Sequence, residues 1–275
     1  MKNKLLAITA LLMAMTLWSC DTEVPFEPYE PEWPEWPEDS SVVAVKKRVA
    51  IMGDSYSTFG GWSNRDVAGN PNDYYVYYPH ICPLTGVDSV EKTWWYMLCQ
   101  KPEFELEISN SNSGAVISNT HYGGVDVAGT DLSFMNRVGK NSFGVDYNGN
   151  PDVILVFGGT NDCWAGVELG KYVYENWSAA DLKCFRPAFS KFLSTLQELY
   201  PDAIVLNITN NVTAGIPGLT KSIAESMQNI CNHYGVYNIV LKDIEKVDGH
   251  PTYKGMQSIC NQVYPAVRWA VRDSK

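Results

Sequence analysis

The sequence has 275 residues, and its 31 acidic and 21 basic side chains give a net charge of −10 at neutral pH. Eight of the acidic residues lie between positions 21 and 39, and residues 1–20 carry two lysines and no acidic residue, so residues 40–275 carry a net charge of only −4. Nucleic-acid binding requires a basic surface, which this mildly acidic body lacks, so we expect no nucleic-acid partner. The body is long enough for one domain with a single hydrophobic core.

The first twenty residues predict an export signal. Lys2 and Lys4 precede an uncharged apolar run, residues 5–17, which is too short to span a bilayer and is typical of a secretory signal peptide. The run ends in Leu-Trp-Ser-Cys, which resembles a lipobox, the motif whose cysteine, here Cys20, is lipidated. We therefore expect a protein anchored to the outer membrane of a Gram-negative cell envelope, on its periplasmic or outer face. An ordinary signal peptide with an incidental cysteine is the alternative.

Residues 21–44 predict an extended linker. Prolines recur at every third position from Pro25 to Pro37, and three residues is the period of a polyproline II helix. The acidic residues between them repel one another and favour an extended chain. We expect this stalk to separate the anchor in residues 1–20 from the folded body in residues 45–275, so that only the anchor contacts a membrane.

The body alternates short apolar segments with amphipathic helical patterns. Five apolar segments predict buried strands, at residues 46–52, 104–109, 153–157, 203–208 and 236–241. Helical spacing of apolar residues occurs in 181–200, in 220–234 and from 251 or 252 onward. Such alternation is typical of βαβ units, in which helices cover both faces of the sheet. We therefore expect an α/β fold, a three-layer αβα sandwich around a central, mainly parallel five-stranded sheet.

Four short motifs lie after predicted strands or before the last helix. They are residues 53–57 (Gly-Asp-Ser-Tyr-Ser), 112–115 (Asn-Ser-Gly-Ala), 158–162 (Gly-Gly-Thr-Asn-Asp) and 249–251 (Gly-His-Pro). Ligands of parallel sheets bind beyond the carboxyl ends of the strands, so we expect these motifs to meet there. Residues 60–92 and 123–150, rich in Gly, Asn and aromatic residues, are expected to form loops over the same edge.

The residue types in these motifs suit acyl transfer. Ser55 supplies a nucleophilic hydroxyl, and His250 supplies a base that can accept its proton and return it to a leaving group. The main-chain N–H groups of Ser55 and Gly114 and the side-chain amide of Asn161 supply donors for an oxyanion. This chemistry needs no cofactor, and no His, Cys or Asp grouping has the spacing of a zinc site, so we expect no metal.

In this order the motifs strongly resemble those of the SGNH branch of the GDSL hydrolase superfamily, over about residues 45–271. The resemblance implies a flavodoxin-like sheet in a catalytic domain that spans residues 45–275. It also implies that Ser55 and His250 are catalytic and that Ser55, Gly114 and Asn161 form the oxyanion hole. Asp54 is mainly a structural hydrogen-bond acceptor in the family, and we interpret Asp162 in the same way.

One motif departs from the family pattern. The family's last motif is Asp-x-x-His, but position 247 is valine, and Asp248 stands only two residues before His250. Either Asp248 reaches the imidazole across a shorter turn and completes a triad, or a main-chain carbonyl near Val247 orients the imidazole. The second alternative leaves a Ser-His dyad, and the sequence leaves both open.

Aromatic residues and histidines in or beside the expected loops are candidate substrate-binding residues, namely Trp62, Tyr78, His80, His121 and Trp164. Aromatic faces in polar loops suit sugar rings, although several of these residues could instead pack the loops onto the domain. We expect a serine esterase that removes short acyl groups, acetyl above all, from extracellular poly- or oligosaccharides. The alternatives are a general short-chain carboxylesterase or lysophospholipase, and a non-catalytic carbohydrate-binding surface lipoprotein.

Six cysteines follow Cys20 and show no Cys-x-x-Cys pair. Export permits disulfides, but a domain of this size does not need them. We expect one or two bridges at most.

Overall fold

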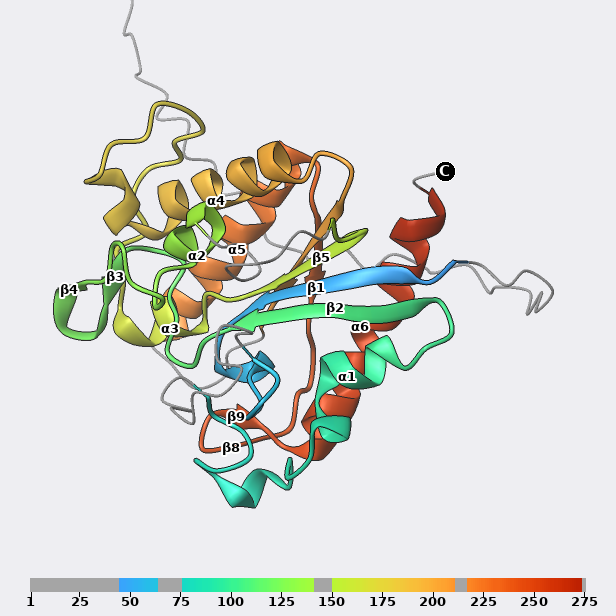
Figure 1. Ribbon diagram of the computed structural model, residues 1–275. Coiled ribbons are helices and arrows are strands. Elements are labelled where there is room, and N and C mark those ends of the chain that lie inside the picture. The colour runs from blue at the N-terminus through green and yellow to red at the C-terminus, as the bar shows by residue number, and fades with distance from the viewer. Residues whose placement is uncertain (1–44, 64–75, 141–149, 211–216, 274–275) are drawn as a thin grey trace, which may run out of the picture. The chain divides into compact units, whose positions relative to one another are not determined.

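The computed structural model describes residues 45–63, 76–140, 150–210 and 217–273 (Figure 1). The predicted signal peptide with Cys20 and the predicted linker, residues 21–44, lie outside the described residues. Within the described ranges, no helix has both the length and the apolar composition needed to cross a membrane.

Five parallel strands form the central sheet. In chain order they are β1 (Lys47–Gly53), β2 (Phe104–Ser111), β5 (Val153–Phe157), β6 (Ile204–Thr209) and β7 (Tyr237–Val240). In space the order is β2-β1-β5-β6-β7, so the strand order reverses at β1, as it does in flavodoxin-like sheets. The predicted α/β sandwich with five strands is confirmed, and every pair in this sheet is parallel.

Both faces of the sheet are buried, and side chains along a strand alternate between them. In β5, Val153, Leu155 and Phe157 pack in one hydrophobic cluster, whereas Ile154 and Val156 pack in the other. None of the five is accessible to solvent. A strand covered on both faces needs an apolar residue at every position, which explains why a continuous apolar run marks β5.

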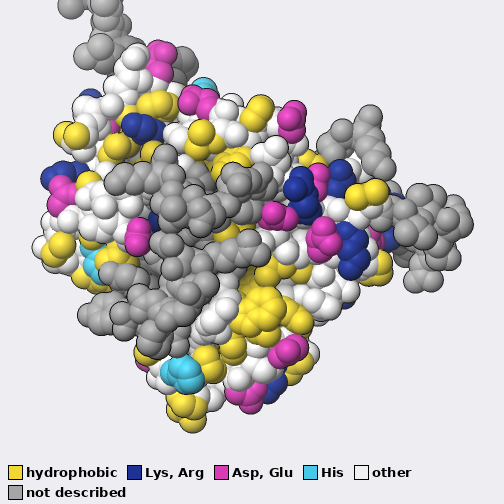
Figure 2. All heavy atoms as spheres, viewed as in Figure 1, with side chains coloured by type: hydrophobic (Ala, Val, Ile, Leu, Met, Phe, Trp, Pro, Cys, Tyr) yellow, Lys and Arg dark blue, Asp and Glu magenta, His cyan; other side chains and the backbone are white. Residues whose placement is uncertain are grey.

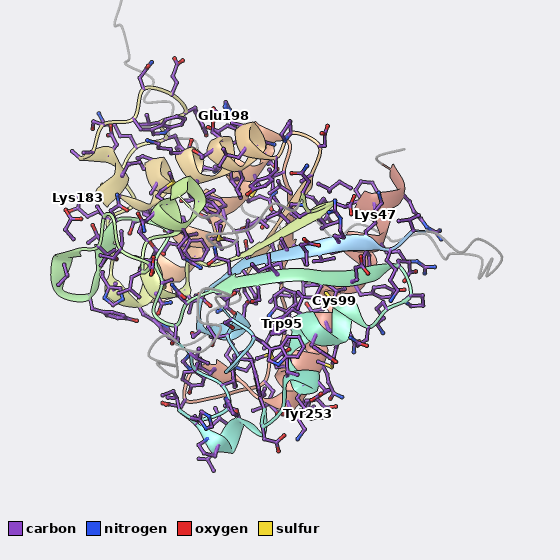
Figure 3. All side chains as sticks on the ribbon, in the orientation of Figure 1. Lys47, Trp95, Cys99, Lys183, Glu198 and Tyr253 are labelled. Atoms are coloured by element: carbon purple, nitrogen blue, oxygen red, sulfur yellow. The ribbon has the colours of Figure 1, made fainter. Side chains whose placement is uncertain are left out.

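Helices cover the two faces (Figure 1). On one face α1 (Trp94–Cys99) packs against α6 (Tyr253–Asp273), and Figure 3 labels Trp95 and Cys99 on α1. The other face is covered by α2 (Phe134–Lys140), α4 (Phe185–Leu199) and α5 (Pro217–Tyr234). The short helix α3 (Thr160–Ala165) begins just beyond the carboxyl end of β5.

The helix predicted over 181–200 begins later than expected. Asp181–Lys183 form a separate 3-10 turn, and Cys184 has an extended backbone, so α4 starts at Phe185. The main-chain N–H and the hydroxyl of Ser178 both donate to the Asp181 carboxylate, at 2.9 and 2.6 Å. This local hydrogen bonding competes with helix formation and stabilises the turn.

Two short antiparallel ribbons lie outside the main sheet. The first pairs β3 (Thr120–His121) with β4 (Val125–Asp126), and the second pairs β8 (Lys246–Val247) with β9 (His250–Pro251). The sequence did not predict either ribbon. Both are short, and both carry residues of the candidate site.

The six cysteines of the body are free thiols, and four of them, Cys99, Cys163, Cys231 and Cys260, are buried. Burial raises the pKa of Cys260 to about 11, so this thiol stays protonated and unreactive near neutral pH.

Surface charge contributes little to the stability of the fold. Side chains of both signs are interspersed over the face shown in Figure 2. Ion pairs such as Lys183–Asp126, at 2.9 Å, join side chains that are about half exposed. Exposed pairs of this kind contribute at most about 1 kcal/mol each. Stability therefore depends mainly on the two apolar clusters.

Removing a large side chain from one cluster tests this conclusion. Phe189 is fully buried on α4, so Phe189→Ala should lower the free energy of unfolding by about 3–5 kcal/mol through lost burial and a residual cavity. The control is Leu199→Ala at the end of the same helix, where the side chain is 50% exposed. It should cost less than about 1 kcal/mol. Urea unfolding followed by circular dichroism measures both, and equal losses would contradict this assignment of the core.

Candidate active site

Ser55 lies in a tight turn that begins where β1 ends. Ser55–Ser57 form a 3-10 turn, and the Asp54 carboxylate caps it by accepting the main-chain N–H of Tyr56 at 3.1 Å. Position 53, just before Asp54, requires glycine, because a Cβ there would lie 2.6 Å from the Cβ of Ser57. The turn therefore brings Ser55 close to the sheet end, where its hydroxyl oxygen lies 2.9 Å from Nε2 of His250.

Asp54 itself is fully buried beneath this turn. Desolvation raises the pKa of its carboxyl group to about 7, while the Tyr56 N–H and the nearby Arg137 guanidinium act in the opposite direction. The carboxylate caps the turn that carries Ser55. These contacts match the structural role that we assigned to Asp54 from the sequence.

His250 is held in place by the β8–β9 hairpin. Val247 and His250 form the last pair of the ribbon, and only Asp248 and Gly249 connect the strands. Their φ angles are +50° and +73°, and a type I′ turn requires two positive values at these positions. Asp and Gly are the residues that such a turn favours. The turn directs the imidazole toward Ser55.

The group that orients the imidazole is a main-chain carbonyl. Nδ1 of His250 donates to the carbonyl oxygen of Asp248 at 3.0 Å, which leaves Nε2 free to accept the Ser55 proton. Of the two alternatives left open by the sequence, the geometry therefore matches the second, a Ser-His pair. The carbonyl belongs to Asp248 itself, because the Asp-Gly turn places this peptide group beneath the ring.

Aromatic side chains surround the imidazole. The ring of Tyr77 stacks on His250 with 3.5 Å between centroids and 9° between planes, and Trp164 approaches edge-on at 5.9 Å. The hydroxyls of Tyr56 and Tyr78 donate to the carbonyls of Gly249 and Pro251, one on each side of His250 in the chain.

The pKa of His250 is lowered by this burial. Desolvation disfavours the imidazolium, whereas the hydrogen bond to Asp248 and its negative charge favour it. The positive charge of Lys246 lowers the pKa further. Neutral His250, the form needed for a general base, is therefore favoured at neutral pH.

The second motif (residues 112–115) and the third (residues 158–162) lie far apart in sequence but next to one another in space. Nδ2 of Asn161, on α3, donates to the carbonyl of Ala115 at 2.9 Å, so the amide lies beside Gly114. Gly114 has a φ of +81°, a conformation that glycine adopts without strain. The hydroxyl of Tyr122 reaches Oδ1 of Asn161 at 3.5 Å. These contacts orient the Asn161 amide.

Two buried charged side chains bind the main chain around the site. Asp162 accepts the main-chain N–H groups of Ile117 and Ser118 at 2.8 and 2.9 Å, which matches the structural role interpreted from the sequence. The guanidinium of Arg137 donates to the carbonyls of Asn110 and Gly53, at 2.7 and 3.0 Å. Desolvation lowers the pKa of Arg137 to about 10.

Of the five candidate substrate-binding residues, Trp164 and His121 contact residues of the site directly. Trp164 lies against His250, and Nε2 of His121 donates to the carbonyl of Gly114 at 2.9 Å. Tyr78 is buried to 1% exposure, so it supports the His250 segment and presents no surface to a substrate. Trp62 packs against Trp95 and Tyr96 near α1, and His80 is exposed.

Sequence reasoning missed two residues of the site, Tyr122 and Arg137, and placed Tyr77 only among the aromatic residues of the loops expected over the site. Tyr122 follows the candidate His121, and this was its only signal. Arg137 had no such signal, because it lies in a segment expected to be a loop and arginine side chains are rarely buried.

Comparisons with known proteins identify the family of the chain. The sequence model of the GDSL-like lipase/acylhydrolase family matches residues 47–267. A solved structure from Bacteroides uniformis ATCC 8492, named a GDSL-like lipase, is 43% identical with a TM-score of 0.69, over 81% of this chain and 96% of that chain. Another so named, from Bacteroides ovatus ATCC 8483, is 38% identical with a TM-score of 0.67, over 82% and 100%.

A more distant solved structure is that of a carbohydrate esterase, which shares the fold at 17% identity with a TM-score of 0.55, over 82% of this chain and 70% of that chain. The search of curated proteins gives no match. All four motifs fall inside the matched residues, and the resemblance drawn from them is confirmed. The chain belongs to the GDSL-like lipase/acylhydrolase family, whose members are serine hydrolases that act on ester bonds.

Proposed function

We propose that this family member is an exported, lipid-anchored esterase that removes short acyl groups, acetyl above all, from extracellular poly- or oligosaccharides. The observation that most directly supports the catalytic part of this proposal is the 2.9 Å distance between the Ser55 hydroxyl oxygen and Nε2 of His250. Nδ1 of the same ring donates to a carbonyl, so this contact has the polarity that general-base catalysis requires.

The proposed reaction uses this chain's own residues throughout. Nε2 of His250 takes the Ser55 proton as the serine oxygen attacks the ester carbonyl, and the oxyanion is bound by the N–H groups of Ser55 and Gly114 and by the Asn161 amide. The imidazolium then gives this proton to the sugar oxygen as the ester C–O bond breaks, so the sugar leaves as an alcohol and the acyl group stays on Ser55 as an acyl-enzyme. Water, activated by His250, hydrolyses that intermediate and restores Ser55.

Polar and aromatic groups at the site support a sugar ester as the substrate. Trp164 lies beside the base, and His121 and Tyr122 lie beside Gly114 and Asn161. Tyr122 is 41% exposed, so its ring is available to a ligand. The shared fold with a carbohydrate esterase agrees with this choice, and that protein's site is described as having divergent catalytic and non-catalytic binding functions.

Hydrolysis by the wild type and by Ser55→Ala tests the function. We expect p-nitrophenyl acetate to be hydrolysed by the wild type, with at least about a thousandfold loss in Ser55→Ala. Acetate release from acetylated xylan, pectin and host glycans should also depend on Ser55. Turnover of the nitrophenyl ester without any glycan would instead favour a general carboxylesterase. No Ser55-dependent turnover, together with glycan binding, would favour the non-catalytic alternative.

Because a main-chain carbonyl orients His250, we expect the side chain at position 248 to tolerate substitution. Asp248→Asn keeps the main-chain acceptor and suits a positive φ, so kcat should stay within about threefold of wild type. Removing the negative charge lowers the pKa of His250, so the acid limb of the rate profile should move slightly to lower pH. A loss near 10⁴, as for a triad acid, would show that the carboxylate acts directly. His250→Asn is the control for complete loss of the base.

The anchor has its own test. Cys20→Ser removes the thiol that the lipobox would lipidate, so the full-length protein should move from the membrane fraction to the soluble fraction of a Gram-negative host. Labelling with a radioactive fatty acid should be lost in the same variant. Unchanged labelling or membrane association would contradict lipidation at Cys20.

A further inference from the structure

We infer that Tyr77 is a positioning residue for the base, whose ring fixes the plane of the His250 imidazole and faces the imidazolium formed during the reaction. The inference rests on the proposed reaction of Ser55 and His250. In a Ser-His-Asp triad the carboxylate orients the imidazole and stabilises the imidazolium. We assign part of this role to the face of the Tyr77 ring.

The stacking geometry distinguishes Tyr77 from the other rings around His250. Its ring lies 9° from parallel at 3.5 Å, whereas Tyr56 meets the imidazole at 61° and 5.4 Å and Trp164 at 64° and 5.9 Å. Among the described aromatic residues, Tyr77 alone stacks parallel to the imidazole. A single hydrogen bond from Nδ1 to a carbonyl leaves the ring free to tilt about that bond, and a parallel ring 3.5 Å away prevents the tilt.

Tyr77 is itself tied to the turn that carries the nucleophile. Its main-chain N–H donates to Oγ1 of Thr58 at 2.9 Å, and that hydroxyl donates to the carbonyl of Ser55 at 2.9 Å. Thr58 and Tyr77 are buried. One short hydrogen-bonded path therefore fixes the stacking ring relative to Ser55, so base and nucleophile are positioned from the same turn.

The aromatic face also affects the charged form of the base. The negative face of an aromatic ring attracts a cation placed over it, so Tyr77 favours the imidazolium over the neutral imidazole. The charged groups that act on the ring are Asp248, which favours the imidazolium, and Lys246, which opposes it. The titratable tyrosines packed around it, Tyr56 and Tyr78, have pKa values raised by burial and stay neutral.

A matched control is available because the hydroxyl of Tyr77 lies near the Cys82 thiol and makes no hydrogen bond to His250 or to the Ser55 turn in the described structure. Tyr77→Phe removes only that hydroxyl and keeps the aromatic face. Tyr77→Leu removes the face and still covers the imidazole with an apolar side chain. The difference between the two variants therefore isolates the aromatic face.

Kinetics on p-nitrophenyl acetate test the inference. Tyr77→Phe should keep kcat within about twofold of wild type, whereas Tyr77→Leu should lower kcat roughly tenfold with little change in KM, because the base is misplaced. The acid limb of the kcat/KM profile should move to lower pH in Tyr77→Leu, by about 0.5–1 unit, because loss of the aromatic face destabilises the imidazolium. A uniform structural defect would not move this limb. The inference would be overturned if the two variants had the same kcat and the acid limb of the kcat/KM profile lay at the same pH in both.

A measurement on the resting protein separates this inference from the proposed function. An NMR titration of the His250 ring, assigned by its loss in His250→Asn, needs no turnover. We expect a lower pKa for His250 in Tyr77→Leu than in Tyr77→Phe, and identical values would overturn the inference. A difference in pKa without Ser55-dependent hydrolysis would support the contact and overturn the esterase. Tyr77→Met serves in place of Tyr77→Leu if melting curves show that the latter is unfolded.

Discussion

The site depends above all on one feature of the sheet: the neighbouring parallel strands β2, β1 and β5 all end at the same level. Gly53, the last residue of β1, pairs with Ser111 of β2 on one side and with Phe157 of β5 on the other. Main-chain hydrogen bonds continue beyond the strands, from Asp54 N–H to the Phe157 carbonyl and from Asn112 N–H to the Gly53 carbonyl. Three motifs far apart in sequence therefore begin side by side, and the fold itself holds them there before any substrate binds.

Buried charges complete this arrangement. Arg137 donates to the Gly53 carbonyl, Asp54 caps the nucleophile turn, and Asp162 binds the main chain at Ile117 and Ser118. Burying a charge is unfavourable unless hydrogen bonds compensate for lost hydration. Each of these groups has such bonds, although those of Asp54 only partly offset the desolvation that raises its pKa. Their bonds go mainly to main-chain atoms, those of Arg137 at Asn110 and Gly53 near the strand ends and those of the two aspartates in the segments that follow the strands. This distribution favours a structural role for these groups.

The sequence predicted the features that depend on local pattern and strand order. The apolar run of β5 marks a buried strand, and the end of a parallel sheet brings Ser55, Gly114 and Asn161 together. It did not predict which atom orients His250, because that depends on one turn. The Asp248-Gly249 pair is a signal for a two-residue hairpin and, read as such, would have indicated the β8–β9 ribbon. Nothing in sequence spacing distinguishes the stacked Tyr77 from the buried Tyr78, since both follow from the path of one loop.

A carbonyl in place of a carboxylate changes how the base functions. A neutral acceptor fixes the tautomer and direction of the imidazole but stabilises the imidazolium less than a full negative charge does. Burial of His250 acts in the same direction, so the neutral base is favoured and the protonated intermediate is less stable. Ester cleavage tolerates this, because an alkoxide is a better leaving group than an amide nitrogen and demands less of the acid. The Ser-His pair held by a main-chain turn is thus better matched to esters than to peptide bonds.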